Sequence, residues 1–421
     1  MYNFNHSDIV LRHYKKNRTI VSSDILPMLQ DISDAVGHEL KVHKYSSGAD
    51  IGTWIIPPQW DVKEAWLKGS DGKVVASYDD HPLFAVPYSS SFTGTVNLKT
   101  LTEHVRLHPK LDDVFFYEHR FAYNYQMRLK DWAITLPRNV LNNLSDSQYY
   151  VHLDFHVSDG EMIVGELCLP GNTDETIALL TDYCHPGQVN DSFSGILATI
   201  DVFKRLKALS SRKYTYRWFL FPETIGSAVL LHDRPDYLEN TVLGIFSEYV
   251  GWGRNWQVNA SMENDNPGNK LGRQIKMMFD DVSLNDLFSG YGNDELVFDF
   301  AGVPSMSVQM TECDEYHSSL DRPELIVQGN IDRAADIIYQ ICWMMENNRN
   351  LKFIQRVPVY LTRFDLYSDD VNEHENFKKI RQILYGIRDG VSLLDIATSK
   401  EISFKYVLQI AEQLAKNKLI E

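Results

Sequence analysis

The sequence predicts an α/β protein built on a doubly wound mixed sheet, with a small inserted β domain and a C-terminal winged helix-turn-helix. Apolar runs typical of buried strands alternate with amphipathic helical patterns through the middle of the chain, a rhythm typical of strands joined by crossover helices. Short β-rich pieces precede this alternation, and short helical patterns follow it. These three observations divide the chain into three expected domains.

The N-terminal part combines helices with an early β insertion. Residues 1–42 carry helical patterns whose apolar stripe includes Ile25, Leu29 and Ile32. From residue 43 to residue 129, β-rich pieces such as "TWIIPP" and "KVVASY" are separated by Gly, Asp and Pro, and "SDGK" is a hairpin-turn signal. We therefore expect an inserted β domain at 43–129, within a catalytic domain formed by residues 1–42 and 130–352.

The middle of the chain alternates strands and helices. The stretch at 149–171 is typical of a β-hairpin. Later strands are expected at "TIALLTDY", "YTYRWFLFPE", "TVLGIFSEYVG" and "VPSMSVQM", with helices near 194–209, 225–231 and 331–348. In such a sheet, ligands bind at the edge formed by the carboxyl ends of the strands.

The tail, residues 353–421, is expected to form a winged helix-turn-helix. Ser392, or the turn just before it, starts one helix, and Ser403 is the expected N-cap of a longer amphipathic helix. The basic residues of this region are balanced by acidic ones such as Glu412 and Glu421. Because DNA readers need a basic surface, the tail favours a structural or protein-contact role over nucleic-acid binding.

The length and charge of the chain limit the classes of function. With 421 residues it is too long for one ordinary core, and its net charge of −16 disfavours nonspecific binding to nucleic acid or anionic membranes. It contains no apolar run of membrane-spanning length and no signal-peptide pattern. The cysteines lack CxxC spacing, so buried free thiols are expected rather than disulfides. We expect a cytoplasmic protein with a small-molecule or peptide substrate, and its oligomeric state stays open.

Acidic and imidazole side chains mark one edge of the expected sheet. They follow or precede the four middle strands: His185 and Asp191, Glu223, Glu248, Asp294 and Glu295, and His317. Zinc in catalytic sites takes imidazoles and carboxylates and leaves one position for water, and a nearby unligated carboxylate can act as general base. Each residue alone has a simpler explanation, such as a helix cap for Glu223. Together they indicate a metal site.

Three segments carry a resemblance to known enzymes. "CHPGQVNDSFSG", "FPETIGS" and "EYHSSLD" resemble the zinc-binding segments of the co-catalytic zinc aminopeptidases. The chain as a whole resembles a bacterial aminopeptidase-like family. That resemblance implies a zinc-aminopeptidase-type sheet with an inserted β domain and a C-terminal winged helix.

The resemblance also implies roles for single residues. His185, Asp191 and His317 resemble metal ligands, and Glu223 resembles the general base that takes a proton from water at the metal. Thr224 stands where a second metal-binding Glu would be, and Gly187 where an Asp would orient the first His. Loss of such an orienting partner can weaken metal binding roughly 10–100-fold.

The expected cofactor is therefore zinc, with one ion favoured and two left open. His185, Asp191 and His317 would hold it, and Glu248 is expected as an extra ligand. Asp294 is expected near the substrate, where acids such as Glu248 or Asp294 would hold a free amine.

The segment at 117–137 combines aromatic and basic residues. It could form a wall over the metal, with Arg128 clamping a carboxylate or an anionic sugar and Trp132 and Tyr125 stacking on a ring or peptide. The alternative is a strand junction whose aromatic residues belong to the core.

Three functions stay open from sequence. The first is a metal-dependent hydrolase that cleaves an amide bond of a small peptide or of an acylated or aminoacylated sugar; the resemblance links the latter to surface polysaccharide synthesis. The second is a non-catalytic metal- or ligand-binding scaffold, favoured by Thr224 and disfavoured by Glu223. The third is a ligand-sensing regulator, which the acidic tail disfavours.

Overall fold

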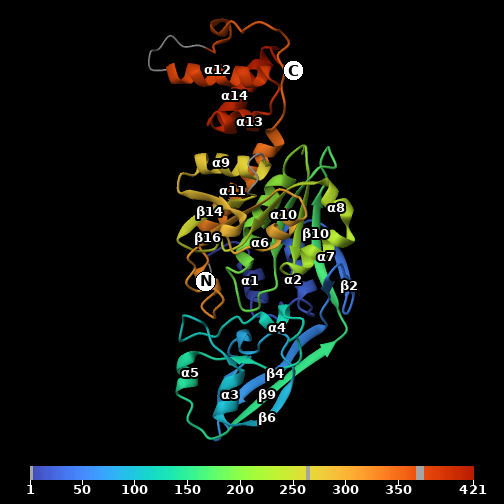
Figure 1. Ribbon diagram of the computed structural model, residues 1–421, viewed down its shortest axis with the longest axis vertical. Helices are drawn as coiled ribbons and strands as arrows, with labels where there is room; N and C mark the ends of the chain where they lie inside the picture. Colours follow the sequence, from blue (N-terminus) through green and yellow to red (C-terminus); the bar gives the residue numbers. More distant parts are fainter. Residues whose placement is uncertain (1–2, 262–265, 367–373) are drawn as a thin grey trace.

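A large mixed sheet forms the centre of the protein (Figure 1). The computed structural model describes residues 3–261, 266–366 and 374–421. In strand order, the sheet contains β1 (Lys41–Ser46), β10 (Glu161–Leu169), β12 (Thr215–Phe221), β11 (Thr176–Asp182), β13 (Thr241–Ser247), β16 (Ser305–Thr311), β14 (Asn255–Ala260) and β15 (Val282–Asp286). The expected α/β class and mixed sheet are confirmed.

The central strands all end at one edge of this sheet. Strand β11 pairs in parallel with β12 on one side and with β13 on the other, and β13 pairs in parallel with β16. The chain leaves β11 towards β12 and later returns to its other side, which creates a topological switch point beside β11. Loops that leave neighbouring strands in opposite directions open a crevice at such a point.

Helices cover both faces of the large sheet. One layer comprises α2 (Ile25–Val36), α6 (Phe193–Lys207), α9 (Pro267–Met278) and α11 (Gln328–Asn347), and the other α7 (Ile225–Asp233), α8 (Pro235–Asn240) and α10 (Asp294–Phe300). Alternate residues of β11 divide between the two cores: Ile177 and Leu179 pack with the first layer, Ala178 and Leu180 with the second. Burial on both faces explains why the middle of this strand, residues 177–180, is continuously apolar.

The N-terminal part supplies a second, smaller sheet below the large one (Figure 1). It contains β5 (Val74–Ser77), β4 (Gln59–Lys68), β9 (Tyr149–Ser158) and β6 (Phe92–Val96). The remaining short elements are α1 (Ser7–His13), β2 (Asp50–Ile51), β3 (Trp54–Ile55), α3 (Leu98–His104), β7 (Val105–Arg106), α4 (Arg120–Tyr123), β8 (Ile134–Thr135) and α5 (Arg138–Asn142).

Strand pairing differs from two expectations. The hairpin expected at 149–171 is wrong, because β9 pairs with β4 and β6 whereas β10 pairs with β1 and β12. Apolar alternation fixes which face of a strand is buried but not which strand lies beside it. Likewise, β1 belongs to the large sheet and β9 to the small one, so strand membership departs from an insert bounded at 43 and 129. These domain boundaries stay predictions.

Three helices form the C-terminal end of the molecule: α12 (His374–Arg388), α13 (Leu393–Ser399) and α14 (Phe404–Lys416). The side chains of Ser392 and Ser403 accept hydrogen bonds from backbone N–H groups of α13 and α14, so both expected N-caps are present. Phe353 and Ile420 form an isolated β-bridge. The winged arrangement stays a prediction. Across the described part of the chain, helices with the length and hydrophobicity of a membrane span are absent.

Gly195 allows the first turn of α6 to lie against the end of β13. An ideal Cβ at this position would lie 1.8 Å from the carbonyl oxygen of Ser247. We expect Gly195→Ala to destabilise the fold by about 3 kcal/mol, because the obstacle is backbone that cannot rotate away. Denaturant unfolding followed by circular dichroism measures this loss.

Gly329→Ala is the matched control, since a Cβ there meets nothing within 4 Å and Gly329 lies in the first turn of α11. This control should be neutral or slightly stabilising. Equal unfolding midpoints for the two variants would contradict the close approach of α6 to β13.

Candidate functional site

A cavity of about 250 Å³ opens where the central strands end. Five of the expected site residues line it: His185, Asp191, Glu223, Glu248 and His317. Asp191 follows β11 by nine residues and Glu223 follows β12 by two, yet parallel pairing places these strand ends side by side. The structure therefore brings together side chains that are far apart in sequence.

Buried polar groups hold the loop that follows β11. The guanidinium group of Arg18, which is fully buried, donates hydrogen bonds to the carbonyl oxygens of Tyr183, His185 and Gln188. On the other side of the loop, the Asp321 carboxylate accepts hydrogen bonds from the backbone N–H groups of residues 189–191. A loop with its backbone bonded from both sides can present His185 and Asp191 in a fixed geometry.

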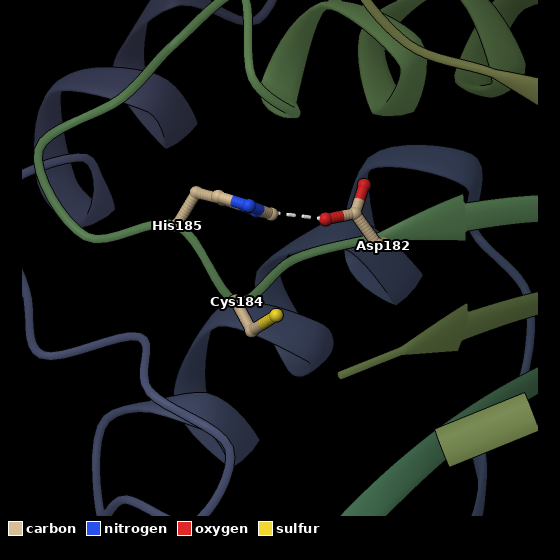
Figure 2. A group of neighbouring side chains, drawn as sticks. All are labelled: Asp182, Cys184 and His185. Atoms are coloured by element: carbon tan, nitrogen blue, oxygen red, sulfur yellow. Dashed lines mark ion pairs between the residues drawn. The ribbon is translucent and has the colours of Figure 1, made fainter. Parts of the chain in front are cut away.

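His185 lies between three carboxylates. Its Nδ1 is 2.9 Å from Oδ2 of Asp182 and 3.2 Å from Oδ1 of Asp191, and its Nε2 is 3.4 Å from Oε2 of Glu223. Figure 2 shows the His185 ring and the Asp182 carboxylate facing each other, with the Cys184 side chain beside them. The Cys184 sulfur instead accepts a hydrogen bond from the Glu223 N–H. The thiol thus supports the Glu223 backbone.

Asp191 links the two histidines. Its Oδ2 lies 3.2 Å from Nε2 of His317 and accepts a hydrogen bond from the Tyr249 hydroxyl. Glu248 approaches from β13, with Oε1 accepting a hydrogen bond from the Asn293 side chain. Asp191 therefore occupies the centre of the group.

Several buried atoms of this group have no hydrogen-bond partner within the described residues. Oδ1 of Asp182 and Oε2 of Glu248 have no ion-pair contact in this part of the chain either, whereas Oδ2 of Asp182, Nδ1 of His185 and Oδ1 of Asp191 contact one another only as ion pairs. Within the described residues, potential ligand atoms lie within 4.8 Å of one another in three sets: His185, Asp191 and His317; Asp182, Asp191 and Glu248; and Asp182, Cys184 and His185. Unpartnered buried acceptors are costly unless a cation or a donor satisfies them. These clusters are therefore compatible with metal binding.

The pKa directions agree with an excess of negative charge. Burial, followed by the charges of Asp191 and Asp182, raises the pKa of Glu248 well above its usual value. Burial also raises the pKa of Asp182. Burial opposes ionisation of Asp191 too, but His185 and His317 outweigh it and lower the pKa of that carboxyl group. A divalent cation would stabilise all of these carboxylates in the charged form.

Thr224 and Asp294 lie together at the back of the cavity. Thr224, with φ 62°, donates its backbone N–H to Oδ1 of Asp294, which also accepts the hydroxyl hydrogen of Ser227. Asp294 is fully buried and is not among the residues that line the cavity. The structure thus places Asp294 behind Thr224, rather than at a surface that a substrate could reach.

Asp182 is a site residue that the sequence reasoning missed. It occupies a place beside Nδ1 of His185, where the resemblance implied an acid at position 187. Gly187 itself has φ 71°, and a Cβ there would lie 2.8 Å from the His81 ring. The available signal was an acid ending a buried strand three residues before the histidine.

The insert reaches the cavity through residues other than those expected. His119 and Tyr123 line the cavity, whereas Arg128 lines a separate hollow and donates its guanidinium hydrogens to the carbonyl oxygen of Ala122. Trp132 stacks on Phe92, a residue of the insert. The structure therefore does not bring Arg128 or Trp132 to the site.

Comparisons with known proteins identify the family of this chain. The profile of the family described as "Domain of unknown function (DUF4910)" matches residues 7–348. The chain belongs to the DUF4910 family. The matched region spans α1 to α11 and contains every residue that lines the cavity.

Relatives of this DUF4910 chain come from several bacteria. A Clostridium acetobutylicum protein, named as a candidate polysaccharide biosynthesis protein with aminopeptidase-like domain, is 26% identical over 91% of this chain and 88% of its own length. A crystal structure of a candidate peptidase from the same organism is 23% identical, with a TM-score of 0.84 over 98% of this chain and 95% of that chain.

Two further structures extend the likeness to a zinc aminopeptidase and to a peptidase of the M28 family. The Bacillus subtilis zinc aminopeptidase BSAP is 14% identical, with a TM-score of 0.60 over 82% of this chain and 96% of that chain. A peptidase M28 precursor from Shewanella amazonensis is 12% identical, with a TM-score of 0.57 over 81% and 91%. At these identities the likeness is one of fold. The aminopeptidase-type fold expected for the DUF4910 chain is thereby confirmed.

Proposed function

We propose that this protein is a zinc-dependent hydrolase of aminopeptidase type that cleaves an amide bond. The convergence of His185, Asp191 and His317 on one cavity beside Glu223 carries the proposal. The unpartnered nitrogen and oxygen atoms of this group suit a borderline cation such as zinc. When bound, zinc would supply Lewis-acid polarisation of the carbonyl group and would lower the pKa of water.

The side chains have distinct parts in this proposal. His185, Asp191 and His317 would hold the ion, with Glu248 and Asp182 as further oxygen donors. Glu223, whose side chain is 23% exposed, keeps contact with the cavity and would accept the proton of the attacking water. Tyr249 fixes the Asp191 carboxylate by its hydroxyl hydrogen bond. We favour one ion, because Thr224 leaves one position without its carboxylate.

The cavity favours a small substrate. Its volume, about 250 Å³, suits one amino-acid residue or one sugar ring rather than a long chain. Tyr291 and Tyr316 stack in parallel along one wall, with ring centroids 5.0 Å apart, and provide flat apolar faces. The name of the Clostridium relative supports an aminoacylated or acylated amino sugar as the substrate class.

A metal-binding scaffold without catalysis is the second candidate. The absence of a carboxylate at Thr224 favours it. The position of Glu223 argues against it, since a scaffold needs no carboxylate that faces the cavity beside the ligands.

Amide hydrolysis by the purified protein tests the proposal. The panel contains aminoacyl p-nitroanilides and N-acylated or aminoacylated amino sugars, each measured with zinc, with EDTA and after zinc is returned. We expect the protein to hydrolyse at least one of these substrates. EDTA should remove this activity, and returned zinc should restore it. Full activity in EDTA would exclude a role for a metal in catalysis. Stoichiometric zinc binding without hydrolysis of any substrate would favour the non-catalytic scaffold.

A further inference from the structure

The insert is attached directly to the loop that carries His317. The N–H of Tyr117 donates to the carbonyl oxygen of His317 at 2.8 Å, and the N–H of Ser319 donates to that of Phe115 at 3.0 Å. Phe116 and Ser318 form an antiparallel β-bridge between these bonds. The segment that follows Tyr117 is therefore held at a fixed distance from His317.

This attachment places His119 in the wall of the cavity, next to His317 of the metal-compatible group His185, Asp191 and His317. Its ring centroid is 5.4 Å from that of His317 and 6.1 Å from that of Tyr123. His119 lines the same cavity as Glu223. It is outside the metal-compatible groups found within the described residues.

The His119 ring has no hydrogen bond to any other described residue, and its Nδ1 is buried without a partner. Other polar groups of the cavity are already engaged. The Tyr249 hydroxyl bonds Asp191, and the Tyr123 hydroxyl lies 3.4 Å from the Cys184 sulfur and 3.5 Å from Oε2 of Glu223. A ring held in place with unused hydrogen-bonding capacity is suited to a ligand.

We propose that His119 donates a hydrogen bond to the substrate carbonyl oxygen as that oxygen gains negative charge. This inference rests on the proposed function. The donated proton stays on the imidazole, so no bond to His119 forms or breaks. Either protonation state of the ring carries at least one N–H, and the donor is therefore present across the working pH range.

The sequence explains why such a donor is needed. Thr224 removes a carboxylate from one metal position, and a single ion supplies less positive charge to the developing oxyanion than two. A preorganised donor of this kind accounts for roughly 10²–10³-fold in turnover when it is removed from other hydrolases. The insert thus contributes a catalytic residue, His119, as well as part of the cavity wall.

The test compares His119→Ala and His119→Gln with the wild type. Kinetics use leucine p-nitroanilide, or the amide from the panel that the wild type cleaves fastest. Calorimetry measures binding of leucine phosphonic acid, a tetrahedral mimic, and of leucine itself; zinc is measured by mass spectrometry. His152→Ala, in β9 and bonded to Thr93, is the control histidine.

We expect His119→Ala to lower kcat by roughly 10²–10³-fold with little change in KM or zinc content. It should weaken binding of the phosphonate but not binding of leucine. His119→Gln should recover part of the lost turnover and part of the lost phosphonate affinity, because its side-chain amide can donate a hydrogen bond. Unchanged kcat and phosphonate affinity would overturn the inference, as would loss of zinc, which would make His119 a ligand. If the wild type neither cleaves an amide nor binds the phosphonate, the proposed function itself fails.

Discussion

Replacement of Glu223 by glutamine is expected to lower the turnover number for amide hydrolysis by roughly 10²–10⁴-fold, the usual contribution of a positioned general base. Glutamine keeps the size of the side chain but cannot accept a proton from water at neutral pH. Glu223 lines the same cavity as Asp191 and His317 but lies outside the metal-compatible groups found within the described residues. Zinc content and unfolding temperature should therefore stay at the wild-type values.

Steady-state kinetics and metal analysis on the same samples separate catalysis from binding. Glu161→Gln is a suitable control, because Glu161 is a half-exposed partner of Lys44 at the edge of the large sheet. If the Glu223→Gln variant keeps more than about a tenth of the wild-type activity, Glu223 is not the general base. Loss of zinc in this variant would instead make it a ligand.

Asp191→Asn is expected to abolish stoichiometric zinc binding. Asp191 belongs to two of the three metal-compatible groups among the described residues, and its neutral replacement removes charge that His185 and His317 contact directly. Zinc binding should also raise the free energy of unfolding. At 100 times its dissociation constant, zinc should stabilise the wild type by about 2.7 kcal/mol. Asp191→Asn should show little of that gain.

Thermal unfolding with and without zinc measures this difference. The surface variant Asp201→Asn, which affects only an exposed pair with Arg205, should respond to zinc as the wild type does. A wild-type unfolding temperature that is indifferent to zinc, together with no bound metal after dialysis, would refute the site.

The sheet edge was predictable because parallel strands have a simple geometry. The continuous apolar run of β11 identified a strand buried on both faces, and that assignment placed His185 and Asp191 at its carboxyl end. Glu223, Glu248 and His317 followed from the same argument. Their convergence in one cavity needed no knowledge of side-chain conformations.

Other parts of the site depend on contacts that sequence spacing does not encode. His119 approaches His317 only because residues 115–117 bond to residues 317–319, at least 200 positions away in the chain. The chemistry of Arg128 suggested a clamp, but its carbonyl partner at Ala122 keeps it elsewhere. Asp182 was overlooked since it lies within the strand pattern itself. Long-range pairing decided the position of His119, whereas contacts within six residues decided those of Arg128 and Asp182.

The buried guanidinium of Arg18 has a consequence for how the protein folds. Since it donates to three carbonyl oxygens of the loop that bears His185, Arg18 can be buried with its hydrogen bonds satisfied only when residues 183–188 are in place. A truncated protein that starts beyond Arg18 would keep every ligand yet lose the cation that shapes their loop. Expression trials of an isolated central domain should accordingly retain the amino-terminal residues.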